Sequence, residues 1–121
     1  MTAKRDDSVY LRHLLHAVSK IETYLRDVDE ERFLRESLIQ DGVIRQLEIF
    51  GEAVKNLSEE LRAQHAHLPW KDMAGMRDKL IHHYFGVDIG IVWITATKDI
   101  PVFKTEIRKI LEISETGFRR N

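Results

Sequence analysis

The sequence has no cysteine among its 121 residues, so structural disulfides and thiolate metal sites are excluded. It also has no apolar run close to the ~20 residues that a membrane-spanning helix needs. The first residues, Met-Thr-Ala-Lys-Arg-Asp-Asp, lack the apolar core of a signal peptide. We therefore expect a soluble, cytoplasmic protein that makes no contact with a membrane.

An excess of either charge is also missing. Lys and Arg number 19 and Asp and Glu number 20, which gives a formal net charge of −1. The global basic field that is typical of nucleic-acid-binding domains is therefore absent, and any contact with RNA has to be local. A chain of this length predicts a single domain, residues 1–121, that buries roughly two-thirds of its unfolded surface.

Apolar residues recur at helical spacing along the whole chain, and no stretch alternates as a strand does. Five helices are expected: one at about residues 7–27, one from Ser37 to about Asn56, one from near residue 69 to Gly86, one that starts at Asp88, and a last one after Pro101. A short helical turn at Phe33 and Leu34 should dock on the core, and Ser58 should cap one further turn through Arg62. The sequence thus predicts an all-α, up-and-down bundle of about five helices.

Local signals refine these boundaries. Ser37 and Gln40 have the spacing of a capping box, and Asp88 suits an N-cap. Pro101 is expected to interrupt or restart the helix. The stretch 117–121, Gly-Phe-Arg-Arg-Asn, predicts a loose basic tail.

Two histidine pairs invite comparison with metal sites. His13 and His16 are three residues apart on a predicted helix, and His65 and His67 alternate in a predicted loop. Zinc sites need three or four ligands, and neither pair has an obvious third. Solvated surface histidines are the simpler interpretation, and no metal or other cofactor is predicted.

The stretch Trp70–Asp88 concentrates the reactive side chains. Arg77 and His82 are five residues apart, which on a helix separates them by roughly 140° around the axis. Asp78 lies one turn before His82 and could orient it or raise its pKa. Because one helix cannot aim both groups at one small target, a site that uses both needs a ligand that wraps the helix or a second copy of the helix.

These residue types suit RNA cleavage without a metal. A base removes the 2′-hydroxyl proton, an acid protonates the leaving 5′-oxygen, and a cation stabilises the crowded phosphorane. His82 titrates in the useful range and Arg77 presents fixed donors to phosphate oxygens. The alternative interpretation is structural, with His82 a favourable cation near a helix end and Tyr84 a half-buried aromatic.

The block Arg77-x4-His82-x-Tyr84 resembles the Arg-x4-His-x-Tyr motif of HepT-like proteins in the HEPN superfamily. Further blocks in the same order are similar to that family: Arg45-Gln-Leu-Glu-Ile-Phe-Gly-Glu-Ala53, Leu57-Ser-Glu-Glu-Leu61, Leu68-Pro-Trp-Lys-Asp-Met-Ala-Gly-Met-Arg77 and Val87-Asp-Ile-Gly-Ile-Val-Trp93. The resemblance therefore covers nearly the whole chain.

This resemblance implies a function. It implies a homodimer with the nuclease residues Arg77 and His82 in the dimer cleft. It also implies a toxin that is restrained by a minimal nucleotidyltransferase antitoxin, through binding and AMPylation of Tyr84. The near-neutral charge favours an alternative, a non-catalytic helical module that binds a nucleotide or the partner transferase.

Overall fold

A computed structural model describes the backbone of residues 3–82 and 88–120, and the side chains of residues 7–76 and 88–113. This part of the chain is helical throughout apart from short turns, and it contains no strand. The predicted all-α class is therefore confirmed. The helices are α1 Ala3–Tyr24, α2 Glu30–Arg35, α3 Ser37–Lys55, α4 Glu59–Gln64, α5 Trp70–His82, α6 Ile89–Ile94, the π-helical turn η1 Thr95–Asp99 and α7 Ile100–Arg120.

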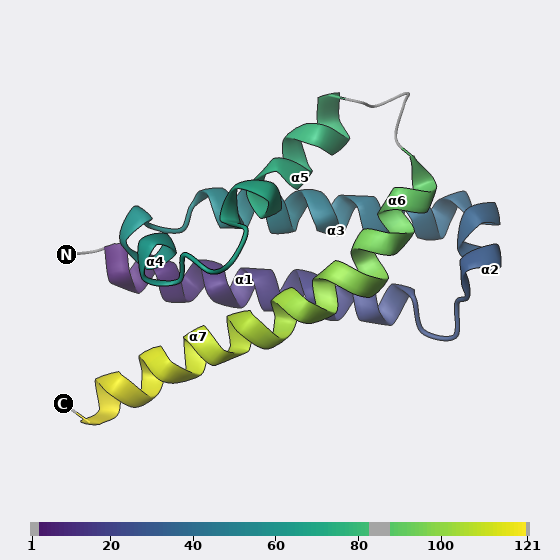
Figure 1. Ribbon diagram of the computed structural model, residues 1–121. Helices are drawn as coiled ribbons and strands as arrows, with labels where there is room; N and C mark the ends of the chain where they lie inside the picture. Colours follow the sequence, from purple (N-terminus) through teal and green to yellow (C-terminus); the bar gives the residue numbers. More distant parts are fainter. Residues whose placement is uncertain (1–2, 83–87, 121) are drawn as a thin grey trace.

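Helix α3 lies at the centre of the fold, and both α1 and α5 pack against it (Figure 1). Helix α1 lies antiparallel beside α3, and α6, η1 and α7 form one continuous rod that crosses the pair. The short helices α2 and α4 lie at opposite ends of the pair. Helix α5 begins against α3 and its C-terminal end rises away from the bundle, so the segment with Arg77 and His82 projects outward.

Apolar side chains from several helices meet in one hydrophobic core. Phe50 of α3 stacks on Phe103 of α7 with ring centroids 6.1 Å apart, and Phe33 of α2 contacts Trp93 of α6 at 5.3 Å. Most apolar residues that recur at helical spacing are buried in α1, α3, α5 and α7, whereas Leu15, Leu25 and Ile44 are only partly buried. The buried ones include Leu11, Leu14, Val18, Ile21, Val43, Leu47, Val54, Met73, Ile107 and Ile110. The short helical turn predicted at Phe33 and Leu34 is α2, which docks on the core through Phe33, whereas Leu34 is 48% exposed.

Helix caps agree with the sequence at two ends and disagree at a third. The Ser58 hydroxyl accepts from Leu61 N, and the Asp88 carboxylate accepts from Gly90 N, as predicted. Ser37, however, lies inside α3, whose N-cap is Glu36 without a side-chain cap bond. The Gln40 side chain instead donates to the Phe33 carbonyl at 2.9 Å, so the predicted capping box is wrong.

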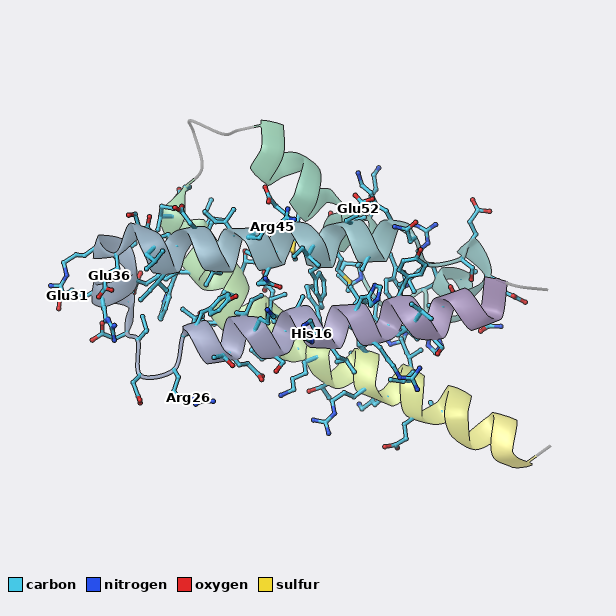
Figure 2. All side chains as sticks on the ribbon, turned by 180° about the vertical axis from the view of Figure 1, so that it is seen from behind. His16, Arg26, Glu31, Glu36, Arg45 and Glu52 are labelled. Atoms are coloured by element: carbon cyan, nitrogen blue, oxygen red, sulfur yellow. The ribbon has the colours of Figure 1, made fainter. Side chains whose placement is uncertain are left out.

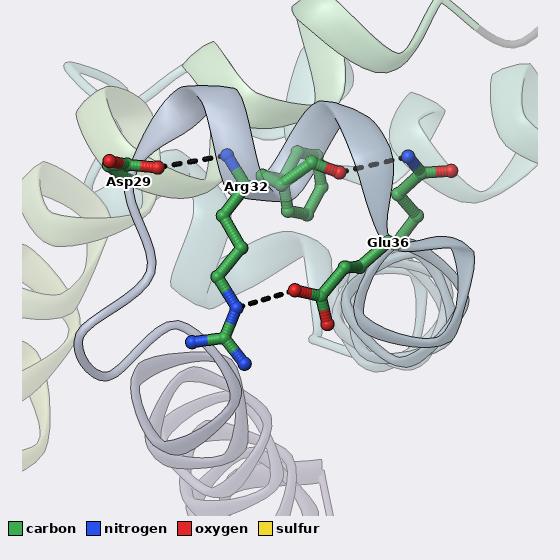
Figure 3. A network of polar contacts seen from close by, with 5 residues as sticks. Asp29, Arg32 and Glu36 are labelled. Atoms are coloured by element: carbon green, nitrogen blue, oxygen red, sulfur yellow. Dashed lines mark hydrogen bonds and ion pairs between the residues drawn. The ribbon is translucent and has the colours of Figure 1, made fainter.

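The polar contacts of α2 explain why α3 starts where it does (Figure 3). Asp29 caps α2 by accepting from Arg32 N, and the Arg32 side chain donates to Glu36 at 2.6 Å. This hydrogen bond also raises the pKa of the Arg32 guanidinium. Because the Glu36 carboxylate is engaged with Arg32 and the Glu36 backbone is extended, the helices break there.

Pro101 changes the type of helix but does not end it. The five-residue turn η1 precedes α7, and Ile100 N donates to the Thr95 carbonyl. A π turn supplies one extra residue, which lets the chain pass a proline that has no N–H to donate. The backbone then stays helical to Arg120, so the predicted loose tail is wrong.

The first helix is shifted relative to the prediction. It begins earlier, at Ala3, and ends at Tyr24, before the expected residue 27. Asp27 has a positive φ of 60°, a left-handed conformation that no helix continues through. Within the described residues, no helix is long and apolar enough to span a bilayer.

Candidate functional site

Helix α5 is anchored at its first residue. The Trp70 ring is buried and its Nε1 donates to the His65 carbonyl at 2.9 Å. Met73, one turn later, is fully buried, and α5 packs along α3. The start of α5 is thus fixed by a tryptophan hydrogen bond and an apolar contact.

The structure places the predicted catalytic residues on the C-terminal half of this helix. Arg77, Asp78 and His82 belong to α5, although their side chains lie outside the described part. Tyr84 falls in 83–87, outside the described residues altogether. The helical backbone puts position 82 two turns beyond Gly75 on one side of α5, and position 77 one turn beyond Met73 on another.

An open groove of about 630 Å³ lies beside the start of α5. We call it the basic groove, because its rim carries Lys55 of α3, Arg62 of α4 and Lys71 of α5 against one acid, Glu59. Its remaining lining includes Trp70, Ala74 and Gly75. Among the described side chains no ion pair to Arg62 or Lys71 occurs, so both cations are available to an anionic ligand.

A second hollow of about 620 Å³ lies on the other side of α5, between it and the α6–η1–α7 rod. This apolar cleft includes Leu47, Met76, Val92 and Phe103, with the carboxylates of Asp72 and Asp99 among its polar groups. Thr95 and Asp99 come from the π turn. Lys71 and Gly75 line both the basic groove and the apolar cleft, so the two hollows meet across α5.

Gly75 stands at this meeting point without a structural reason to be glycine. Its φ is not positive, and a Cβ added there would meet no atom of the described residues within 4 Å, apart from its chain neighbours and its own helix backbone. Glycine inside a helix costs about 1 kcal/mol relative to alanine. The residue weakens α5 and leaves the helix surface open two residues before Arg77.

A third groove, of about 360 Å³, lies between α1 and α3. We call it the α1–α3 groove, and its charged groups include Arg45, Glu48 and Glu52 (Figure 2). Arg45 lies 3.7 Å from Glu48. His13 also lines it and meets the edge of the Tyr10 ring at 5.6 Å.

The other histidines make ordinary contacts. The rings of His65 and His67 are 6.1 Å apart, and His67 Nε2 lies 3.2 Å from Glu106 of α7. Residues 7–76 and 88–113 hold no group of three or more side chains with metal-ligand chemistry. The described histidines therefore give no reason to place a metal in the site.

Comparison with known proteins identifies the family. Residues 14–110 match the model described as "HepT-like: Ribonuclease HepT-like", and the chain belongs to this HepT-like family. No solved structure matches the chain.

Relatives of this chain carry ribonuclease names. A "Putative RNase" of Methanocaldococcus jannaschii is 45% identical over 90% of this chain and 94% of its own length. A "Probable ribonuclease HepT" of Thermococcus cleftensis is 44% identical over 88% and 97%. A "Gamma-glutamylcyclotransferase and putative RNase" of M. jannaschii is 49% identical over 90% of this chain, which spans only 49% of that longer protein.

Sequence reasoning located α5 but missed the basic groove. Lys55, Arg62 and Lys71 stand on three helices and are spread among acids in the sequence. No spacing rule links them, because they come together only through the two turns that join α3 to α4 and α4 to α5. The one available signal was Gly75, an unexplained glycine inside a predicted helix.

Proposed function

We propose that this protein is a metal-independent ribonuclease in which Arg77 and His82 carry the chemistry. The observation that supports this most is that both residues lie on one continuous, outward-projecting helix of a HepT-like chain. The names of its relatives agree with RNA as the substrate. The proposed unit of function is the single helical domain 1–121.

The proposed chemistry needs two proton-transfer groups and one cation. His82 removes the proton from the 2′-hydroxyl, whose oxygen then attacks the adjacent phosphorus. Arg77 stabilises the charge on the phosphorane oxygens. The 5′-oxygen leaves with a proton, and the products are a 2′,3′-cyclic phosphate and a 5′-hydroxyl end.

A homodimer would complete this site. Positions 77 and 82 lie on different sides of α5, so one copy of the helix does not present both to one phosphate. Two antiparallel copies of the projecting end would supply His82 of one protomer as base and His82 of the other as acid. Asp78, one turn before His82, would orient the imidazole or raise its pKa.

The direct experiment is cleavage of RNA by the purified protein in EDTA. We expect activity that Arg77→Ala and His82→Ala each remove, with unchanged melting curves. Binding of RNA or nucleotide without cleavage by the native protein would favour the alternative, a non-catalytic binding module. Loss of cleavage in EDTA that returns with a divalent ion would refute the metal-independent mechanism.

The biological role that fits this chemistry is a toxin held in check by a minimal nucleotidyltransferase antitoxin. AMPylation of Tyr84 would add a phosphate ester and an adenosine seven residues after Arg77 in the same motif, where negative charge and bulk would hinder the docking of RNA. After co-expression with a partner transferase, mass spectrometry should find added AMP on the peptide that contains Tyr84. Tyr84→Phe should remove that modification while RNA cleavage is retained, and an unmodified peptide with suppressed toxicity would refute this role of the tyrosine.

A further inference from the structure

The basic groove has the chemistry of a site for a phosphodiester backbone. It gathers Arg62 and Lys71, neither of which has an ion-pair partner among the described side chains, together with Lys55, against the single acid Glu59. The salt bridges of the described residues involve neither Arg62 nor Lys71, so these two cations are open to a ligand. Proteins that hold single-stranded RNA combine such a cationic groove with apolar surface for the bases.

Gly75 lies where the basic groove meets the apolar cleft. Because an added Cβ would meet no atom, the glycine is not required by packing, and because its φ is not positive it is not required by the backbone. The remaining use for a missing side chain is the close approach of a ligand to the helix. Lys71 and Gly75 line both hollows, so a ligand at this point would reach the basic groove and the apolar cleft together.

The meeting point of the two hollows at Gly75 also lies close to the predicted motif residues on α5. Gly75 precedes Arg77 by two residues, and the backbone of α5 puts position 82 on the side of Gly75 and Lys71. A chain that passes over Gly75 therefore continues along the same side toward position 82, and it reaches position 77, about 160° around the axis, only by wrapping the helix. This is the geometry that a ligand wrapping the helix requires.

We propose that a single RNA strand crosses α5 over Gly75, with a backbone phosphate in the basic groove on Lys71 and Arg62 and the neighbouring base in the apolar cleft. The inference rests on the proposed ribonuclease function and adds the path of the substrate. Lys71, Arg62 and Gly75 are positioning residues, since they act on the strand outside the scissile phosphate.

The test measures binding of a single-stranded RNA oligonucleotide to the protein carrying His82→Ala, which keeps the RNA intact. In that background, Lys71→Ala and Arg62→Ala should each weaken binding about fivefold. Each should also reduce the slope of log affinity against log salt by about 0.7, the value for one lost phosphate contact on a single strand. Lys20→Ala, which removes an exposed lysine from α1 outside the groove, is the matched control and should change neither quantity.

Gly75→Leu tests the crossing itself. The open space at Gly75 means that the leucine should be accommodated without loss of melting temperature. RNA binding should fall by about tenfold or more, because the new side chain occupies the path of the strand. Ala63→Leu, at an exposed position of α4 that lines neither hollow, should bind RNA as the parent does.

The outcomes separate this inference from the proposed function. If the native protein cleaves RNA but Lys71→Ala and Gly75→Leu bind it as tightly as Lys20→Ala does, the path is wrong and the nuclease stands. If the native protein never cleaves RNA but these variants lose binding as expected, the nuclease assignment fails and the groove stands.

Two other results would overturn the proposed path. A changed sedimentation coefficient for Gly75→Leu with unchanged RNA affinity would make the groove an interface between protein chains. Equal affinity for 5′-AMP and for the oligonucleotide, with both weakened alike by Lys71→Ala, would make it a site for a free nucleotide.

Discussion

The basic groove and the α1–α3 groove contain similar residue types but carry opposite charge. The basic groove has three cations against Glu59, whereas the α1–α3 groove has Arg45 against Glu48 and Glu52. A formal net charge of −1 averages these surfaces. A nearly neutral protein can therefore hold a local site for a polyanion, because the packing of its helices decides which charged side chains lie together.

The largest effect should come from the arginine on the projecting helix. Arg77→Lys is expected to lower kcat/KM for RNA cleavage about a hundredfold, nearly as far as Arg77→Ala, because lysine keeps the charge but loses the planar fork that binds two phosphate oxygens. Arg45→Lys in the α1–α3 groove should leave kcat/KM unchanged. Near-native cleavage by Arg77→Lys would mean that Arg77 supplies only local positive charge.

The next effect is on stability and concerns a carboxylate that serves the fold. Asp7 is buried and accepts hydrogen bonds from Ser58 N at 2.8 Å and from Ser58 Oγ at 2.6 Å, which ties α1 to the N-cap of α4. Asp7→Ala should lower the free energy of unfolding by about 2–3 kcal/mol, because hydrogen bonds to a charged group are lost and a backbone donor is left without its acceptor. Chemical denaturation would measure it.

A double-mutant cycle isolates that contact. Ser58→Ala also removes the cap on Leu61 N, so it should be destabilising alone, but its effect should be smaller in the Asp7→Ala background. Because Ser58→Ala keeps the backbone N–H, the cycle measures the bond from the Ser58 hydroxyl to Asp7, and strict additivity of the two changes would show that this bond contributes nothing.

Alanine substitutions at two helical glycines should change the free energy of unfolding by smaller amounts, which differ between the two positions. Gly75→Ala should raise the free energy of unfolding by about 1 kcal/mol, since alanine is the better helix former and its Cβ meets open space. At Gly42 the same Cβ would lie 3.3 Å from the Tyr24 ring, which must shift to admit it. Gly42→Ala should therefore gain less or lose stability, and equal gains at both positions would contradict this interpretation.

The smallest effect should appear in the pH dependence of stability. The hydrogen bond from His67 lowers the pKa of Glu106 below its ordinary value of 4.5, with Lys109 acting in the same direction. A carboxylate with a lowered pKa in the folded state stabilises the protein at pH values above its unfolded pKa, and this stabilisation is lost as the pH falls through the folded pKa. Glu106→Gln should therefore be slightly less stable than the native protein at pH 6, and the difference should shrink below about pH 4.5. A difference that does not vary with pH would exclude this ionisation as its cause.

The sequence was a good guide to what burial dictates. Leu14, Phe50 and Ile107 recur at helical spacing because each helix hides one face, and all three are buried. Ser58 and Asp88 were recognised as caps because a cap bonds to groups two or three residues away. Such signals are local and can be found by spacing alone.

The rest depends on contacts that spacing does not encode. Ser37 had the capping-box pattern, but Gln40 donates to the Phe33 carbonyl and Glu36 occupies the cap. The basic groove escaped notice because its cations approach one another only after three helices pack. The motif residues Arg77 and His82 were assigned by family resemblance, and their roles remain predictions.

The π turn has a consequence for how the chain tolerates insertion and deletion. Buried positions follow one another as Val92, Ala96, Ile100 and Phe103, and two successive steps of four overshoot the 3.6 residues of an α-helical turn. The wider turn η1 accommodates this excess, so the buried faces of α6 and α7 stay aligned. Deleting one residue of 95–99 would restore a uniform α-helix and rotate α7 by about 100°, which would turn Ile107 and Ile110 away from the core. The one extra residue in η1 therefore decides which face of α7 is buried.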